Sequence, residues 1–168
     1  MDNRKLTDHF TLYDLTATNH EDLQYTNRLL SDDQTAKLQR VAELVEMVWS
    51  ILEVPVMISS GYRCAALNQA VGSSLRSQHL LCEAADIVPR GMEVLDAFKK
   101  LRQAAKEHKF HFGQLLFEQA NRGYGEGVSW IHISLGFPYR NIQRCGQILT
   151  MNEGTYTLID TIPQEEAA

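Results

Sequence analysis

The sequence predicts one α+β domain with a central antiparallel sheet flanked by helices. Two long segments carry apolar residues at spacings of three and four, the pattern of amphipathic helices. Several shorter apolar segments end in Gly, Pro or Ser and are typical of strands. The last strands are joined by short connections, which favours antiparallel pairing. We expect a single domain over residues 1–168, with its core at about 8–162.

Composition places the chain among soluble globular proteins. Hydrophobic residues make up 44% and charged residues 22%, and the net charge of −5 gives no electrostatic reason to expect nucleic acid as a partner. No apolar run approaches the roughly 20 residues of a membrane span, and the N-terminus lacks the apolar core of a secretory signal. We therefore expect a monomer, cytoplasmic as synthesised, with Cys64, Cys82 and Cys145 as reduced thiols.

The N-terminal third contains the clearest helix. Residues 8–16 read as a short turn capped by Thr11, and the polar residues 17–30 as a connecting loop. Ser31 then begins a helix that ends near Leu52, because Ser is a preferred N-cap and the next two Asp residues suit the positive helix end. Its apolar stripe is Leu38, Val41, Val45, Val48 and Leu52.

Strands and helices are mixed through the remainder of the chain. A second long helix runs from Met92 to about His108, and residues 65–70 form a short one. The Gly-rich residues 121–127 form a loop, and the chain ends in a hairpin turned at 152–154 followed by a tail from Pro163. The expected strands are 56–59, 84–88, 112–118, 128–134, 147–151 and 155–160.

Two motifs offer three metal ligands. The stretch from Ser77 to Asp86 contains His79 and Asp86, and the stretch from Ser129 to Ser134 contains His132. Two imidazoles and one carboxylate suit a catalytic Zn²⁺, whose fourth position must stay open for water. His79 would lie in a loop and the other two on strands, so a sheet could bring all three together.

Asp86 is placed inside an apolar strand, where a carboxylate needs compensation. Burying an unpaired charge costs on the order of several kcal/mol, which a bound cation would offset. The alternative is an ion pair with Arg63 or Arg76. On the later strand, alternation puts Trp130 and Ser134 on the same face as His132.

The order of motifs resembles the zinc D-Ala-D-Ala carboxypeptidase family over residues 8–136. Relatives of this family include phage endolysin L-alanyl-D-glutamate peptidases, vancomycin-resistance dipeptidases and the hedgehog signalling domain. The resemblance implies an antiparallel sheet flanked by helices, a zinc held by His79, Asp86 and His132, and cleavage of peptidoglycan stem peptides. The motifs are 60–63 (SGYR), 67–68 (LN), 71–72 (VG), 77–79 (SQH), 84–86 (AAD), 114–118 (QLLFE) and 130–134 (WIHIS).

The resemblance also implies catalytic roles for three residues. Arg63 and Ser77 match positions that hold a substrate carboxylate, and Glu118 matches the general base. Each has an ordinary alternative: Arg63 could pair with an acidic neighbour, Ser77 could form a turn, and Glu118 could be a solvated charge at a strand end.

Two departures from the family pattern bear on activity. Cys82 stands where the family usually has Gly, so the loop either tolerates Cys or changes path, and the thiol could act as an extra zinc ligand. Ser129 stands where many relatives have the catalytic carboxylate, which makes Glu118 the first choice of base and Glu126 the second.

We therefore expect a zinc-dependent peptidase that hydrolyses peptidoglycan stem peptides, as a carboxypeptidase or an L-Ala-D-Glu endopeptidase. Such an enzyme would be phage- or prophage-associated and would act on the bacterial cell wall. The alternative, favoured by Cys82 and Ser129, is a zinc-binding structural or interaction module of the same fold that has lost catalysis.

Overall fold

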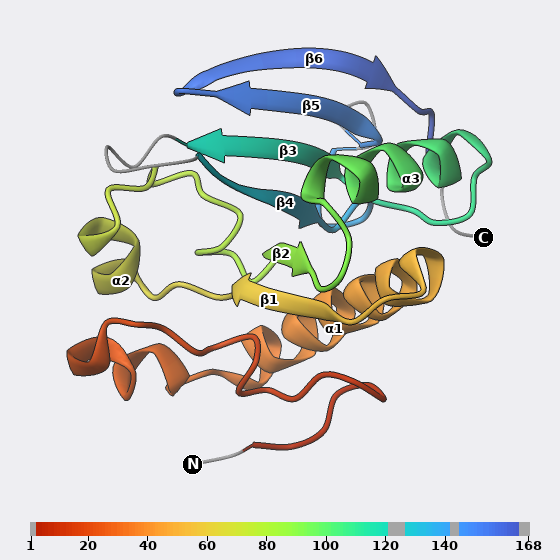
Figure 1. Cartoon of the computed structure of the whole chain (residues 1–168). Coiled ribbons are helices and arrows are strands. Elements are labelled where there is room, and N and C mark those ends of the chain that lie inside the picture. The colour runs from red at the N-terminus through yellow and green to blue at the C-terminus, as the bar shows by residue number, and fades with distance from the viewer. Residues whose placement is uncertain (1–2, 121–126, 142–144, 165–168) are drawn as a thin grey trace.

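The α+β class with a central sheet and flanking helices is confirmed (Figure 1). The structure is a computed structural model that describes residues 3–120, 127–141 and 145–164. Its helices are α1 (Asp32–Leu52), α2 (Ala65–Ala70) and α3 (Val94–Lys106). Its strands are β1 (Val56–Ser60), β2 (Ala84–Pro89), β3 (Gln114–Ala120), β4 (Val128–Ser134), β5 (Gln147–Asn152) and β6 (Thr155–Thr161).

Helix α1 begins as its sequence predicts. The Ser31 hydroxyl accepts a hydrogen bond from the Gln34 amide at 3.2 Å, and the Gln34 side chain accepts one from the Ser31 amide at 2.9 Å. This capping box satisfies two backbone donors that the first turn leaves without helical partners. The predicted stripe faces the core, and the helix ends at Leu52, followed by the C-cap residue Glu53 in a left-handed conformation with φ 61°.

The sheet is mixed, which corrects the expectation of a wholly antiparallel one. Its order is β1-β2-β4-β3-β5-β6, and β3 and β5 are parallel whereas the other neighbours are antiparallel. The chain leaving β4 returns past the start of β3, where Gly146 N donates to Phe112 O at 2.9 Å and Gln147 N donates to Gly113 O at 3.1 Å. Strand β5 therefore starts beside the start of β3 and runs in its direction.

The two faces of the sheet have different partners. Helices α1 and α3 contact each other and pack against the sheet, with α3 lying across β3 and β4 (Figure 1). Fully burying an aliphatic or aromatic side chain there contributes about 1.5–3 kcal/mol each. Because successive strand residues alternate, the opposite face receives Asp86, His132 and Glu118. The buried sheet residues of the helical side include Ala85, Ile87, Leu115, Ile131 and Ile133.

The N-terminal segment is more ordered than the sequence indicates. Thr11 forms the expected turn, with its amide and its hydroxyl each 2.7 Å from Asp14 Oδ2. Residues 17–30, expected as a loop, contain two 3-10 turns, η1 (Glu21–Leu23) and η2 (Thr26–Arg28). The buried Asn27 side chain donates to Tyr62 O at 3.0 Å and accepts from Cys64 N at 2.7 Å, so this segment braces the turn after β1. Among the described residues, no helix combines the length and the apolar character that a membrane-spanning segment needs.

Candidate metal centre and active site

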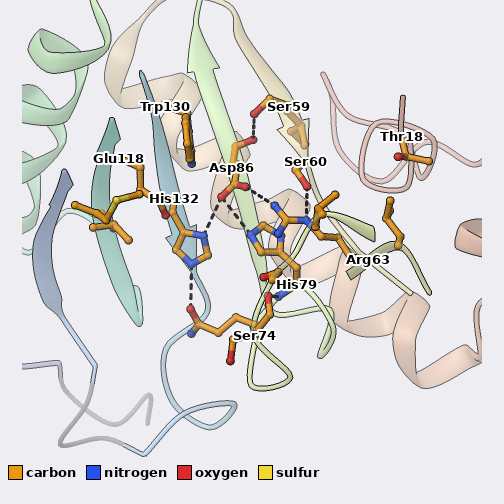
Figure 2. Close-up of a pocket in the computed structure, with 18 of the residues that line it drawn as sticks. Thr18, Ser59, Ser60, Arg63, Ser74, His79, Asp86, Glu118, Trp130 and His132 are labelled. Carbon is orange, nitrogen blue, oxygen red and sulfur yellow. Dashed lines mark hydrogen bonds and ion pairs between the residues drawn. The ribbon is translucent and has the colours of Figure 1, made fainter. Parts of the chain in front are cut away.

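The three predicted metal ligands lie together on the face of the sheet that the long helices leave uncovered (Figure 2). Asp86 in β2 is directly opposite His132 in β4, and the loop before β2 brings His79 to the same place. Asp86 Oδ1 is 2.9 Å from His132 Nδ1 and 3.2 Å from His79 Nε2. All three side chains are buried, and one ligand atom of each lies within 4.8 Å of the others.

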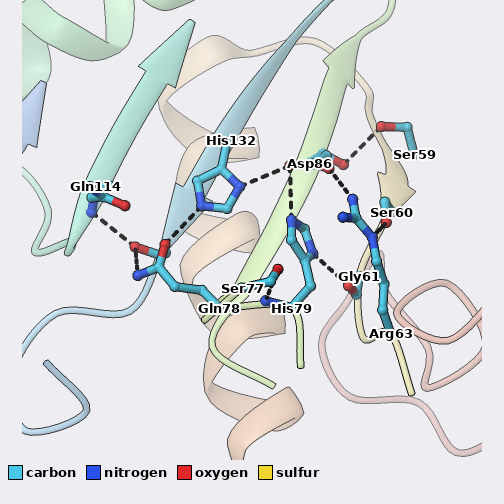
Figure 3. Close-up of polar contacts among 11 residues, drawn as sticks. Ser59, Ser60, Gly61, Arg63, Ser77, Gln78, His79, Asp86, Gln114 and His132 are labelled. Atoms are coloured by element: carbon cyan, nitrogen blue, oxygen red, sulfur yellow. Dashed lines mark hydrogen bonds and ion pairs between the residues drawn. The ribbon is translucent and has the colours of Figure 1, made fainter. Parts of the chain in front are cut away.

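The outer nitrogen of each imidazole faces an oxygen acceptor (Figure 3). His79 Nδ1 lies 2.7 Å from the Gly61 carbonyl oxygen, and His132 Nε2 lies 3.0 Å from Gln78 Oε1. Because these oxygens only accept hydrogen bonds, both outer nitrogens carry protons. In a neutral imidazole the inner nitrogen then presents a lone pair. Both inner lone pairs point toward Asp86.

This arrangement fits a divalent cation. Two imidazole lone pairs and a carboxylate oxygen repel one another unless a proton or a metal lies among them. Nitrogen, nitrogen and oxygen ligands from two His and one Asp suit zinc. Burial alone would raise the pKa of Asp86. Without a metal, a proton on the imidazole nitrogen that faces Asp86 takes the place of the cation, and the charge and hydrogen bonds of His79 and His132 then hold that pKa well below its usual range. The carboxylate is thus ionised and ready to act as a ligand.

Gln78 orients His132, a contact that sequence reasoning did not identify. Its amide nitrogen donates to Ser134 Oγ at 2.9 Å, while its oxygen accepts from His132 (Figure 3). The backbone amide of Gln114 also donates to Ser134 Oγ at 2.9 Å, which connects this hydroxyl to β3. Such partners outside the ligand set fix the tautomer and orientation of a ligating imidazole. The only indication in the sequence is that Gln78 adjoins His79.

Gly61 orients His79 and requires the absence of a side chain. A Cβ at Gly61 would lie 2.3 Å from the Leu15 carbonyl oxygen, far inside normal contact distance. The same carbonyl accepts a hydrogen bond from Tyr62 N at 2.7 Å. The N-terminal segment therefore packs directly on the turn whose carbonyl holds the His79 ring.

Arg63 is paired with a predicted metal ligand. Its Nη2 donates to Asp86 Oδ2 at 2.8 Å and its Nε donates to Ser60 Oγ at 2.9 Å. This is the acidic pairing that the sequence analysis left open as an alternative, and it leaves Asp86 Oδ1 for the metal. Arg63 also lines the cleft that surrounds the site. Its contact with a substrate carboxylate stays a prediction.

Ser77 makes the contact of a turn-forming residue. Its hydroxyl accepts from the His79 amide at 3.3 Å, and its own amide donates to Ser74 O at 3.0 Å. These bonds shape the loop that carries His79. Ser77 lines the cleft as well, and its contact with substrate stays a prediction.

Glu118 lies in the cleft near the three ligands, and the pKa of its carboxyl group is raised. Its pKa is raised to about 7, chiefly by burial and then by the negative charge of Asp86, while His132 and Arg63 oppose the rise. A carboxyl group with a pKa near the working pH is suited to both accept and return a proton. Glu126, the second choice of base, lies outside the described residues. Ser129 lines the same cleft.

Cys82 has the backbone conformation that glycine would favour, and its thiol is not one of the converging ligand atoms. Its φ is 59°, in the left-handed region, so the loop accommodates Cys in a conformation that glycine adopts more readily. The thiol is fully buried, and burial raises its pKa to about 12. It does not belong to the converging ligand group. Cys64 and Cys145 are likewise buried and unpaired.

A large open cleft surrounds the site. Its volume is about 1310 Å³, and the sheet face forms its floor (Figure 2). Residues 17–20, 71–74 and 76–78 form the side next to Arg63, and residues of β4, β5 and β6 form the other. The lining residues nearest the chemistry are Ser60, Arg63, Ser77, Gln78, His79, Asp86, Gln114, Glu118, Trp130 and His132.

A converging His–Asp–His group beside a carboxyl group in an open cleft is the kind of site that metal-dependent hydrolases use. Comparison with protein families agrees, because the family model described as Peptidase M15 matches residues 8–134. The chain belongs to the peptidase M15 family, which confirms the resemblance at the level of the family. A search of curated proteins gives no match. Membership indicates a peptidase and suggests zinc as its metal.

Proposed function

We propose that the protein is a zinc-dependent peptidase that hydrolyses peptidoglycan stem peptides. The observation that carries this proposal is the convergence of three lone-pair donors beside a carboxyl group whose pKa is raised to about 7. His79 Nε2, His132 Nδ1 and Asp86 Oδ1 would hold the metal. When bound, zinc supplies a Lewis acid that polarises the scissile carbonyl and promotes attack by water at neutral pH.

Glu118 supplies the acid–base function in this proposal. As a carboxylate it accepts the proton of the attacking water, and as a carboxylic acid it returns that proton to the leaving amine. The raised pKa supports both roles, because either form is accessible near neutral pH. Its place on the cleft floor, on the same sheet face as His132, supports access to a peptide held at the metal.

Arg63 and Ser77 bind and orient the substrate in this proposal. Arg63 holds Asp86 Oδ2 through one end of its guanidinium, and among the described residues no hydrogen bond engages its Nη1. A guanidinium can bind two groups at once because its five donors form a fixed fork. A substrate carboxylate would bind at Nη1, with the Ser77 hydroxyl beside it.

The test is digestion of purified cell-wall sacculi with measurement of released amines and bound zinc. Zinc-loaded wild-type protein should release amines, and Glu118→Gln should lower kcat by about 100- to 10,000-fold while retaining the metal. Glu43→Gln, outside the cleft, is the matched control and should behave as wild type. Mass spectrometry of the fragments decides between a carboxypeptidase and an L-Ala-D-Glu endopeptidase.

The second candidate is a zinc-binding module without catalysis. Ser129 at a cleft position where many relatives carry a carboxylate favours it. Stoichiometric zinc with no released amine would support this module and reject the peptidase. Protein that binds no zinc after exposure to excess metal would reject both. A phage or prophage lysis role is proposed on the family resemblance and is tested by lysis of bacteria exposed to the protein.

A further inference from the structure

Glu118 stands in a row of side chains that crosses four strands. Register pairs Glu118 with Trp130 of β4 on one side and with Met151 of β5 on the other. Met151 is paired in turn with Tyr156 of β6. Residues directly opposite each other in neighbouring strands project from the same face. Trp130, Met151 and Tyr156 therefore share the cleft face with Glu118, and all four line the cleft.

The outer part of this row comes from outside the region that the family comparison matches. The match covers residues 8–134 and includes the three ligands, Glu118 and Trp130. Met151 and Tyr156 belong to the C-terminal hairpin β5–β6, beyond that region. The hairpin is joined to β3 by parallel pairing, and Arg102 and Lys106 of α3 hold its Asp160 at 3.4 and 3.3 Å. Tyr156 therefore belongs to a hairpin that is held in place by β3 and α3.

Tyr156 is an exposed aromatic side chain at a functional cleft. Its side chain is 61% exposed, whereas its cross-strand neighbour Met151 is 9% exposed. Its pKa is raised by partial burial first and then by the charges of Glu118 and Asp86, which places the phenol within electrostatic reach of the site. Exposed aromatic groups of this kind commonly provide contact area for a ligand at low conformational cost.

The two sides of the cleft differ in chemistry. The side of α2 and the loop that follows it brings the cations and hydroxyl groups of Arg63, Ser74, Arg76 and Ser77 to the cleft, together with the apolar Leu67 and Val71. The side of β4, β5 and β6 offers Val128, Trp130, Met151 and Tyr156 around Glu118. A charged, carboxylate-bearing part of a ligand is favoured on the first side. An alkyl-bearing, uncharged part is favoured on the second.

We propose that Met151 and Tyr156 form a subsite for an uncharged, alkyl-bearing residue of the peptide, across the scissile bond from its carboxylate-bearing residue. This subsite deepens the proposed peptidase function and rests on it for the identity of the ligand. The hairpin thereby sets the direction in which a peptide lies over the metal ligands. Tyr156 acts through contact with substrate and takes no part in proton transfer.

The test measures binding separately from turnover. A synthetic stem pentapeptide is titrated calorimetrically into zinc-loaded Glu118→Gln protein, with and without Tyr156→Ala. We expect the dissociation constant to rise about 10-fold in Tyr156→Ala, the effect of losing one aromatic contact. Tyr156→Phe, which keeps the ring, and Thr157→Ala, on the same strand but absent from the cleft lining, should stay within about 2-fold.

The outcomes separate the subsite from the activity. A dissociation constant that Tyr156→Ala leaves unchanged overturns the subsite, even where wild-type protein hydrolyses the peptide. An equal loss in Tyr156→Phe also overturns it, because the ring would then not be the contact. A shift specific to Tyr156→Ala upholds the subsite, and lack of turnover by wild type would then reject the peptidase alone. Absence of any peptide binding rejects both.

Discussion

Replacement of Glu118 by Gln should make the stability of the metal-free protein less sensitive to pH. Burial, followed by the negative charge of Asp86, raises the Glu118 pKa from 4.5 to about 7, so the folded state resists ionising this group. The stabilisation is present below pH about 4.5, where both states are protonated, and it is lost as the pH rises through about 7. Wild type should therefore lose stability relative to Glu118→Gln over this window, because Gln cannot ionise.

The shift in pKa sets an upper limit on the effect. At about 1.4 kcal/mol for each pKa unit, a rise from 4.5 to about 7 corresponds to at most about 3.5 kcal/mol. The carboxyl group is partly exposed, and solvent screening reduces the expected difference to about 1–2 kcal/mol. Groups that do not interact with Glu118 are common to both proteins and cancel in the comparison.

The assay is urea unfolding of both proteins in the presence of a chelator, at pH 5 and at pH 8. The free energy of unfolding of Glu118→Gln minus that of wild type should increase between these two values. A difference that stays constant with pH would refute the reasoning, because it would mean that Glu118 has the same pKa folded and unfolded. A decrease would mean that the folded protein favours the ionised form.

Three further predictions concern residues around the site and α1. Gln78→Leu removes the hydrogen-bond acceptor of His132 Nε2 and should weaken zinc binding by about 10- to 100-fold. Competition with a chromophoric chelator measures this affinity. An unchanged affinity would show that the Gln78 amide does not hold the His132 ring. Gly61→Ala places a Cβ 2.3 Å from Leu15 O and should lower the unfolding free energy by about 1–3 kcal/mol, whereas wild-type stability would contradict the close approach. Ser31→Ala removes the N-cap and should lower it by about 1 kcal/mol without changing zinc affinity, so a loss of zinc would argue against a purely local role.

Local patterns were sufficient to predict most elements. Helix α1 follows from a Ser N-cap and one apolar stripe, both of which depend on residues a few positions apart. The pairing of β5 with β3 was not predictable in this way, because strand neighbours depend on the path of the segment that joins them. The short 3-10 turns in residues 17–30 were missed since they have no apolar period, and their Asn27 is fixed by partners distant in sequence.

The sequence by itself determined the candidate ligands His79, Asp86 and His132, the family, and the chemistry that two imidazoles and a carboxylate permit. Only the tertiary structure decided which nitrogen of each ring faces Asp86, because the other nitrogen of His79 and of His132 is hydrogen-bonded to Gly61 O and to Gln78 Oε1, respectively. It alone decided that Arg63 pairs with Asp86 and that Glu118 is buried enough to raise its pKa. Residue type and spacing can nominate a group for a reaction, but its protonation and direction depend on neighbours brought from elsewhere in the chain.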